Sequence, residues 1–220
     1  MIKGLIFDLD GVITDTAEYH YLAWKSLAEK IRIDIDREFN EQLKGISRME
    51  SLELILKHGN KSEAYTLEEK EKLATQKNEE YKEYIKQVTP ADLLPGIAEL
   101  LRDAREQGIG MSLASASKNA PEIMSRLEID GLFKGIVDPA SLKAGKPDPE
   151  IFIRGAELLG LSVKECVGLE DAEAGIESIN AADMFSVGVG SKEAMKEADY
   201  AVESTSELRL ETILEKASAN

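Results

Sequence analysis

The chain opens with a short apolar run that ends at two aspartates and a glycine. Residues 2–7 read IKGLIF, and Asp8, Asp10 and Gly11 come directly after them. A short apolar run of this kind is typical of a strand that is buried on both faces of a parallel sheet. The first residues therefore predict a sheet covered on both faces by other elements, which favours an α/β fold.

The acids at the end of this strand are the first candidates for chemistry. In an open α/β sheet the ligand crevice lies at the carboxyl ends of the strands, so Asp8 and Asp10 are expected at its rim, where Gly11 lets the backbone turn away. Two neighbouring carboxylates in a dry site need a cation to stay ionised. A divalent metal ion would leave one as nucleophile and the other as proton carrier. An ordinary strand followed by an Asp-Gly turn is the alternative.

From Ile97 onward, patterns of strand length alternate with patterns of helix length. This alternation predicts an α/β core with a doubly wound, Rossmann-like parallel sheet. Helices are expected over 97–107, 119–127, 149–159, 172–181, 192–197 and 208–216, and strands over 109–114, 133–137, 166–169, 186–189 and 200–202.

Between the first strand and this alternation, the sequence has helical patterns only. Apolar residues recur at helical spacing over 16–31, around 52–56 and over 67–85, with Asp15 or Thr16 as N-cap of the first helix. Two prolines and a glycine then mark the return to the sheet. We expect an inserted all-helical cap domain with its linkers at 15–95, and a core domain made of 1–14 and 96–220.

The composition of the chain limits which binding partners and which cellular location are expected. The 42 acidic and 27 basic residues give a formal net charge of −15, which disfavours nucleic acids and anionic membrane surfaces as partners. No apolar run has the length of a membrane span and the first residues lack a signal-peptide pattern, so a cytoplasmic protein is expected, as a monomer. The single cysteine, Cys166, excludes an intrachain disulfide, and its apolar neighbours indicate a buried thiol.

Further polar groups follow the later strands. Hydroxyls and backbone amides at a helix start suit phosphate oxygens, so Ser115 and Ala116 are candidates to hold a transferred phosphate. The alternative is an ordinary turn in which a serine caps the next helix. The neighbouring residues expected to face a substrate are Ser117, Lys118 and Asn119.

Two more candidates come from loops that would reach the same crevice. Lys146 lies between a glycine and a proline, where it is suited to bridge Asp8 and a phosphoryl oxygen, although most lysines are solvated. Glu170 and Asp171 end an apolar run as Asp8 does, and with Asp8 and the carbonyl of Asp10 they would form an oxygen site for Mg²⁺. Asp171 is alternatively the N-cap of the following helix.

The order of these motifs resembles that of the haloacid dehalogenase-like phosphotransferases. The resembling residues are Asp8-Leu-Asp10-Gly11-Val12 with Thr14 and Asp15, then the motifs at Ser115, Lys146 and Glu170-Asp171. The resemblance implies that Asp8 becomes an aspartyl phosphate and that Asp10 acts as general acid and base. It also implies functional roles for Ser115 and Lys146.

Within this superfamily the chain is similar, over nearly its whole length, to the β-phosphoglucomutase family. The similarity covers Asp8 to Glu18 and the stretch from Leu43 to Arg48. It implies catalytic roles for Thr16 and His20, the latter orienting Asp10. It also implies that a group of residues in the cap binds substrate: Trp24, Lys44, Gly45, Arg48, Ser51 and Lys77.

We therefore expect an isomerase that interconverts β-D-glucose 1-phosphate and D-glucose 6-phosphate. The resemblance implies one Mg²⁺ per chain, glucose 1,6-bisphosphate as intermediate or activator, and a small sugar phosphate as the partner. One alternative is a magnesium-dependent phosphatase on the same scaffold, in which water attacks the aspartyl phosphate. A non-enzyme alternative is a phospho-receiver or metal-binding regulatory module, although such a module would be shorter and would lack the cap.

Overall fold

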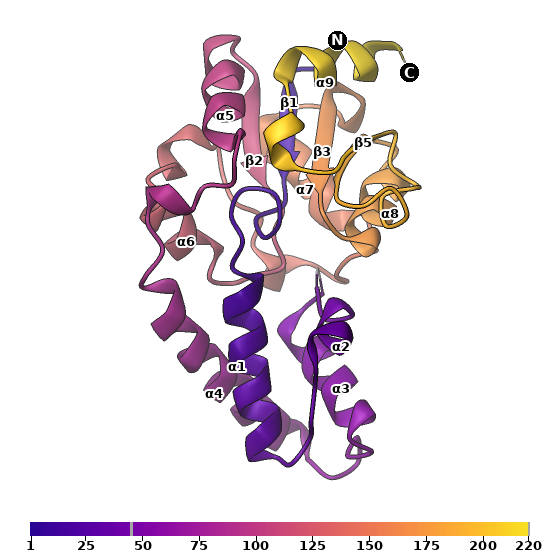
Figure 1. The fold of residues 1–220 in the computed structure, drawn as a ribbon. Coiled ribbons are helices and arrows are strands. Elements are labelled where there is room, and N and C mark those ends of the chain that lie inside the picture. Colours follow the sequence, from indigo (N-terminus) through magenta and orange to yellow (C-terminus); the bar gives the residue numbers. More distant parts are fainter. Residues whose placement is uncertain (45, 220) are drawn as a thin grey trace. The chain divides into compact units, whose positions relative to one another are not determined.

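The chain is described by a computed structural model (Figure 1) that covers residues 1–44 and 46–219. Gly45, one of the residues expected to bind substrate, therefore lies outside the described residues. The chain divides into two compact units, one made of residues 1–15 and 89–220 and the other of residues 16–88. We call the first the core unit and the second the helical unit.

The described part of the core unit holds one five-stranded parallel sheet, in the order β2-β1-β3-β4-β5. The direction of winding reverses at β1, because β2 is added on one side of it and β3 on the other. In sheets with this strand order, the crevice beside the first strand is the usual ligand position. The strands are β1 (Gly4–Phe7), β2 (Gly110–Leu113), β3 (Cys166–Glu170), β4 (Phe185–Val189) and β5 (Tyr200–Val202).

Helices of the core unit cover the sheet and close its core. Two of them pack together, one against β1 and β2 and the other against β3 and β4, and their apolar residues form a buried cluster with Ile6 and Cys166. These are α7 (Glu150–Leu159) and α8 (Glu173–Ala181), and the others are α5 (Ile97–Glu106), α6 (Ala120–Arg126) and α9 (Leu210–Ala219). Short 3-10 turns occupy 90–92, 130–132, 139–141, 163–165 and 205–207. The parallel sheet with an α-helical segment inserted after β1 confirms the predicted fold class.

The helical unit has a core of its own. Its apolar cluster includes Trp24, Leu27, Leu52, Ile55 and Leu56, all buried. Two of its helices begin with a capping box, in which the side chain of the N-cap and that of a glutamate three residues later each bond to the other's backbone amide. The helices are α1 (Ala17–Lys30), α2 (Arg37–Glu41), α3 (Arg48–His58) and α4 (Leu67–Ile85). The short helix α2 was not predicted.

Two predicted elements are wrong. Residues 133–137 form no strand, because they run beside β2 at the edge of the sheet and make a single bridge, between Leu113 and Ile136. Residues 192–197 form a turn rather than a helix. In this connection between β4 and β5 the Ser191 hydroxyl accepts the Ala194 amide at 3.3 Å, a local side-chain bond that competes with helical backbone bonding.

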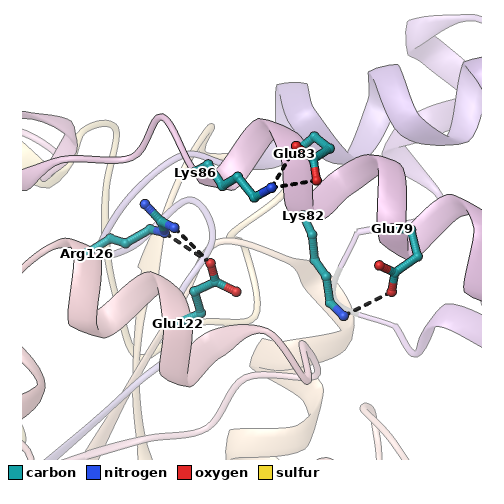
Figure 2. Close-up of polar contacts among 6 residues, drawn as sticks. All are labelled: Glu79, Lys82, Glu83, Lys86, Glu122 and Arg126. Carbon is teal, nitrogen blue, oxygen red and sulfur yellow. Dashed lines mark hydrogen bonds and ion pairs between the residues drawn. The ribbon is translucent and has the colours of Figure 1, made fainter.

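Several helices carry ion pairs on their exposed sides. On α4, Lys82 pairs with Glu79 at 3.0 Å and Lys86 pairs with Glu83 at 2.6 Å (Figure 2). Such exposed pairs each stabilise their own helix by only a few tenths of a kcal/mol. None of the helices in the described ranges combines the length and the apolar composition that a membrane span requires.

Candidate functional site

The core unit brings three acids together at the point where its sheet changes direction. Asp8 follows β1, Glu170 ends β3 and Asp171 comes next, and each offers one carboxylate oxygen within 4.8 Å of the others. The Asp8 amide donates to the Leu169 carbonyl at 2.9 Å, which ties the end of β1 to β3. The predicted meeting of acids from two strand ends is thus present in the structure.

Lys146 lies between two of these acids. Its Nζ donates to Asp8 Oδ1 at 2.6 Å and to Glu170 Oε2 at 2.7 Å. The side chains of Lys146 and Glu170 are completely buried, and that of Asp8 is 9% exposed. A buried cation between two buried carboxylates offsets much of the cost of removing their charges from water. The lysine is therefore part of the site and not a solvated surface residue.

The second oxygen of Glu170 binds the backbone of the next loop. Glu170 Oε1 accepts the amides of Asp171 and Ala172, each at 3.1 Å. Because both of its oxygens are engaged, Glu170 holds Lys146 and the loop carrying Asp171 in one arrangement. The N-terminal cap position of α8 is Ala172, without a side-chain cap, so the alternative role of Asp171 as N-cap is wrong.

Two glycines make room for these acids. Gly11 has a φ of +76°, and a Cβ at this position would lie 2.1 Å from Asp171 Oδ2. At Gly175, a Cβ would lie 2.0 Å from the carboxyl carbon of Glu170. Any larger residue would displace an acid at either place, so the close approach of backbone to carboxylate requires glycine.

The charges in the cluster influence one another strongly. Burial, and then the neighbouring Glu170 carboxylate, raise the pKa of Asp8 to about 7, against the opposing effect of Lys146. Burial disfavours the charged form of Lys146, but the carboxylates of Asp8 and Glu170 outweigh it and raise the pKa of Lys146. The lysine is thus held as a cation. A further positive charge beside Asp8 would lower its pKa again and favour its carboxylate.

The acid cluster fits a hard divalent cation. Within the described residues it is the one group of three or more acids, cysteines or histidines close enough to hold a metal ion, and its donors are all carboxylate oxygens. Oxygen donors of this kind suit Mg²⁺ better than zinc. A cation there would also supply a positive charge beside Asp8. The cluster is therefore consistent with a magnesium site.

The predicted phosphate loop follows β2, the neighbour of β1 on the other side. Ala114 donates its amide to the Phe7 carbonyl at 2.7 Å, so the residues after β2 begin beside Asp8. The Ser115 hydroxyl is buried and accepts the Ser117 amide at 3.2 Å, while the N-cap position of α6 is Asn119. Ser115 therefore does not cap α6. In the same loop, Ala116 and Ser117 are half-buried and Lys118 is exposed.

The helical unit gathers a second set of predicted residues along α1 and α4. The Nζ of Lys77 lies 2.7 Å from His20 Nδ1 and 4.7 Å from the centre of the Trp24 ring. Thr16 occupies the N-cap position of α1 without capping it, since its hydroxyl instead bonds the Tyr81 hydroxyl at 2.8 Å. Burial, with the charges of Lys77 and Arg48, lowers the pKa of His20 well below its usual value.

The remaining predicted residues lie around the start of α3. Lys44 pairs with Glu41 at 2.8 Å, and Ser51 is buried with its hydroxyl donating to the Ser47 carbonyl at 3.1 Å. Arg48 is the first residue of α3 and is half-buried. Burial lowers the pKa of its guanidinium, so this cation is already partly stripped of water.

The structure thus forms two local groups from the predicted residues, one of acids with Lys146 in the core unit and one around Lys77 in the helical unit. Sequence reasoning missed Tyr81, which touches several members of the second group. A signal was available, because Tyr81 is four residues after Lys77 on a predicted helix and therefore on the same face.

Known proteins resemble this chain over most of its length. Residues 2–183 match the haloacid dehalogenase-like hydrolase family. β-Phosphoglucomutase of Bacillus subtilis is 53% identical over 215 residues, which are 98% of this chain and 95% of that protein. The crystal structure of β-phosphoglucomutase from Clostridium difficile has a TM-score of 0.98 at 51% identity, covering 100% of this chain and 98% of the other.

A more distant relative has a different name. A phosphorylated carbohydrates phosphatase of Thermotoga maritima is 28% identical over 186 residues, which are 82% of each chain. Its identity is about half that of the mutase from Bacillus subtilis. The chain belongs to the haloacid dehalogenase-like hydrolase family and, within it, to the β-phosphoglucomutases.

Proposed function

We propose that this enzyme interconverts β-D-glucose 1-phosphate and D-glucose 6-phosphate by passing a phosphoryl group through Asp8. The observation that carries the proposal is the 53% identity to a β-phosphoglucomutase over 98% of the chain. The buried arrangement of Asp8, Lys146 and Glu170 supports it, because it is the kind of charged, dry site that phosphoryl transfer requires.

The proposed reaction has two transfers. Phosphorylated Asp8 first gives its phosphoryl group to the 6-hydroxyl of β-glucose 1-phosphate, and Asp10 takes the proton of that hydroxyl. The product is glucose 1,6-bisphosphate and a free Asp8 carboxylate. In the second transfer the Asp8 carboxylate attacks the phosphorus at position 1, and Asp10 returns the proton to the leaving sugar oxygen. Glucose 6-phosphate leaves and Asp8 is phosphorylated again.

Lys146 has two tasks in this scheme. Between transfers it donates a hydrogen bond to the Asp8 carboxylate. Its positive charge favours the ionised form of Asp8, which is the form that acts as nucleophile. During transfer its charge stabilises the equatorial oxygens of the phosphoryl group, aided by the Ser115 hydroxyl and the Ala116 amide. Glu170 fixes the position of Lys146 through the 2.7 Å bond.

We assign Mg²⁺ to Asp8, Asp171, Glu170 and the backbone carbonyl of Asp10. When bound, the ion would neutralise charge on the transferred phosphoryl group. Lys146 uses one lone pair of Asp8 Oδ1 and one of Glu170 Oε2, so both carboxylates would keep lone pairs for the ion.

We assign recognition of the sugar phosphate to the helical unit. Arg48 can bind a phosphate with two parallel bonds, and its partial burial makes such bonds stronger than they are in water. We assign binding of the non-transferring phosphate to Arg48. Lys44 and Ser51, which are close to Arg48 in the sequence, are proposed to contribute to the same site. Thr16, Trp24 and Lys77 are proposed to help to hold the sugar phosphate, and His20 to orient Asp10.

One assay tests the proposal. The enzyme is incubated with β-glucose 1-phosphate, Mg²⁺ and a trace of glucose 1,6-bisphosphate, and glucose 6-phosphate and inorganic phosphate are both measured. We expect glucose 6-phosphate to account for nearly all of the substrate consumed. The α-anomer serves as the control and should react far more slowly. Release of mainly inorganic phosphate would contradict a mutase.

That contrary result would favour the second candidate, a sugar-phosphate phosphatase on the same scaffold. The specific observation behind this candidate is the similarity to the phosphatase from Thermotoga maritima. In a phosphatase, water would attack the aspartyl phosphate, with Asp10 taking its proton. A cytoplasmic location and a monomeric state stay predictions.

A further inference from the structure

A fully buried tyrosine connects the predicted functional residues of the helical unit. Tyr81 is among the largest side chains with no exposed surface. Its ring stacks on that of His20, with centroids 4.0 Å apart and planes 24° apart, and the Nζ of Lys77 lies 4.7 Å from its centre. Its hydroxyl bonds that of Thr16 at 2.8 Å. One side chain thus contacts three residues to which the proposed function gives roles.

These contacts follow from the spacing of residues on two helices. Thr16, His20 and Trp24 are four residues apart at the start of α1, and Lys77 and Tyr81 are four apart on α4. Residues four apart share one face of a helix, so the two rows meet where α1 and α4 pack together. Tyr81 reaches Thr16 and His20, and Lys77 reaches His20 and Trp24.

The contacts restrict the His20 ring in two ways. Stacking on Tyr81 fixes the plane of the ring, and the bond from Lys77 fixes its rotation within that plane. With Lys77 as an ammonium group, which can only donate, His20 Nδ1 is the acceptor and a neutral ring carries its proton on Nε2. The Nε2–H therefore points in one direction only.

From this geometry we infer that Tyr81 is a positioning residue for the sugar-phosphate reaction. Its ring holds His20 and Lys77 in place, and its hydroxyl holds Thr16. The inference rests on the proposed function, because it needs these three residues to act on the substrate or on Asp10. It adds a residue that acts through His20, Lys77 and Thr16 and not on the reacting atoms themselves. Without the ring, His20 would rotate and its proton would no longer be directed.

Two variants separate the ring from the hydroxyl. Tyr81→Phe keeps the stacked ring and removes the hydroxyl that bonds Thr16. Tyr81→Leu removes the ring as well. The matched control is Tyr84→Phe, on the same helix, where Tyr84 stacks on Tyr19 at 5.8 Å. For each variant kcat and KM are measured with β-glucose 1-phosphate, and hydrolysis of acetyl phosphate is measured in parallel.

The structural readout is the ¹⁵N chemical shift of each imidazole nitrogen in histidine-labelled protein. The chain has two histidines, and His58, which lies against Phe39, serves as the internal reference. In the wild-type protein we expect His20 to give the signature of a neutral ring with the proton on Nε2. If a Tyr81 variant only destabilised the fold, the fraction of active enzyme would fall, but the His20 ¹⁵N shifts of the folded protein would stay unchanged.

The inference predicts a graded result. Tyr81→Phe should keep the His20 signature and lower kcat/KM for the sugar phosphate by about three- to tenfold, the effect of one hydrogen bond. Tyr81→Leu should move the His20 shifts towards those of a mixture of tautomers. It should also lower kcat for the sugar phosphate by about 10²-fold, the scale of a lost acid-base partner, and affect acetyl phosphate hydrolysis much less. Tyr84→Phe should match the wild type throughout.

Several results would overturn the inference. Unchanged His20 shifts in Tyr81→Leu would do so, and so would moved shifts without any loss of kcat. Equal losses on the sugar phosphate and on acetyl phosphate would indicate a role in folding alone. Should Tyr81→Leu fail to fold, Tyr81→Phe still decides, because kcat/KM within twofold of the wild type would refute the role of the hydroxyl. If the wild type converted no sugar phosphate, the proposed function would fail, and the His20 shifts alone would decide whether Tyr81 holds the ring.

Discussion

Replacing Lys146 by methionine should both destabilise the core unit and nearly abolish catalysis. Methionine has a similar length and fills the same buried space, but it removes the charge between Asp8 and Glu170. The side chains of Lys146 and Glu170 are 0% exposed and that of Asp8 is 9% exposed, so water cannot take the place of the lost cation. The substitution therefore leaves two buried carboxylates facing each other.

Breaking a buried ion pair by removing one partner costs about 3–5 kcal/mol, because the remaining charge is left without compensation. The lower end of this range is expected here, since one of the two carboxyls can take up a proton. The total free energy of unfolding of a domain is only about 5–15 kcal/mol, so the loss is a large fraction of it. Removing a charge that stabilises the transferred phosphoryl group should also lower kcat by ~10²-fold or more.

The assay is urea unfolding in the presence of a chelator, followed by circular dichroism, with amide exchange on β1 as a local probe. Lys143→Met is the control, because Lys143 is exposed in the same loop. Glu170→Gln should cost less in the Lys146→Met background than in the wild type, since it removes one of the two repelling charges. If Lys146→Met were as stable as Lys143→Met, the charge balance described for this site would be wrong.

Three further predictions concern the cap residues and the metal. Arg48→Ala should lower kcat/KM for the sugar phosphate at least tenfold and should lower acetyl phosphate hydrolysis much less. Lys57→Ala, at an exposed position of the same helix, is the control. Equal losses on the two substrates would mean that Arg48 does not bind the non-transferring phosphate. Chelation should abolish activity and added Mg²⁺ should restore it, and Asp171→Ala should need a far higher concentration of Mg²⁺ for activity. Full activity after exhaustive chelation would exclude the metal site. Because the pKa of His20 is lowered in the folded chain, the unfolded chain binds a proton at this histidine at a higher pH than the folded chain does. The free energy of unfolding of the wild type should therefore fall relative to that of His20→Gln as the pH falls below about 6.5. Fluorescence of Trp24 during urea unfolding measures this difference, and the opposite slope would contradict a neutral, enclosed ring.

The acid cluster was predictable from the sequence because its position follows from topology. Acids that end two parallel strands meet at one edge of the sheet, so the strand pattern alone places Asp8 near Glu170. The long helix α4, Leu67–Ile85, was also predicted to the residue, since its apolar spacing and its Thr66 cap are local signals.

The parts that were missed depend on packing between elements. The spacing of Tyr81 from Lys77 places both on one face of α4, but the residues of α1 that this face contacts depend on the register between the two helices, which a single sequence does not show. The short helix α2 arises where the Asp36 side chain accepts the Phe39 amide at 2.7 Å, within a stretch with too few apolar positions to show a period. The segment 133–137 has a strand-like composition and bonds β2 through the Lys134 and Val137 amides, but it makes a single bridge and so does not count as a strand.

Trapping of a phosphoryl group on Asp8 tests the central claim most directly. Asp10→Asn should retain the nucleophile while slowing transfer to and from a sugar oxygen by ~10²-fold or more, so that the phosphorylated enzyme accumulates with acetyl phosphate and Mg²⁺, because the acetate leaving group needs no proton from Asp10. Reduction with borohydride converts an aspartyl phosphate to homoserine, and mass spectrometry of the peptide covering residues 4–25 then locates the change. The account predicts homoserine at Asp8, with Asp10→Asn giving more of it than the wild type and Asp8→Asn giving none. Modification at Asp15 instead, or none in any variant during turnover, would contradict it.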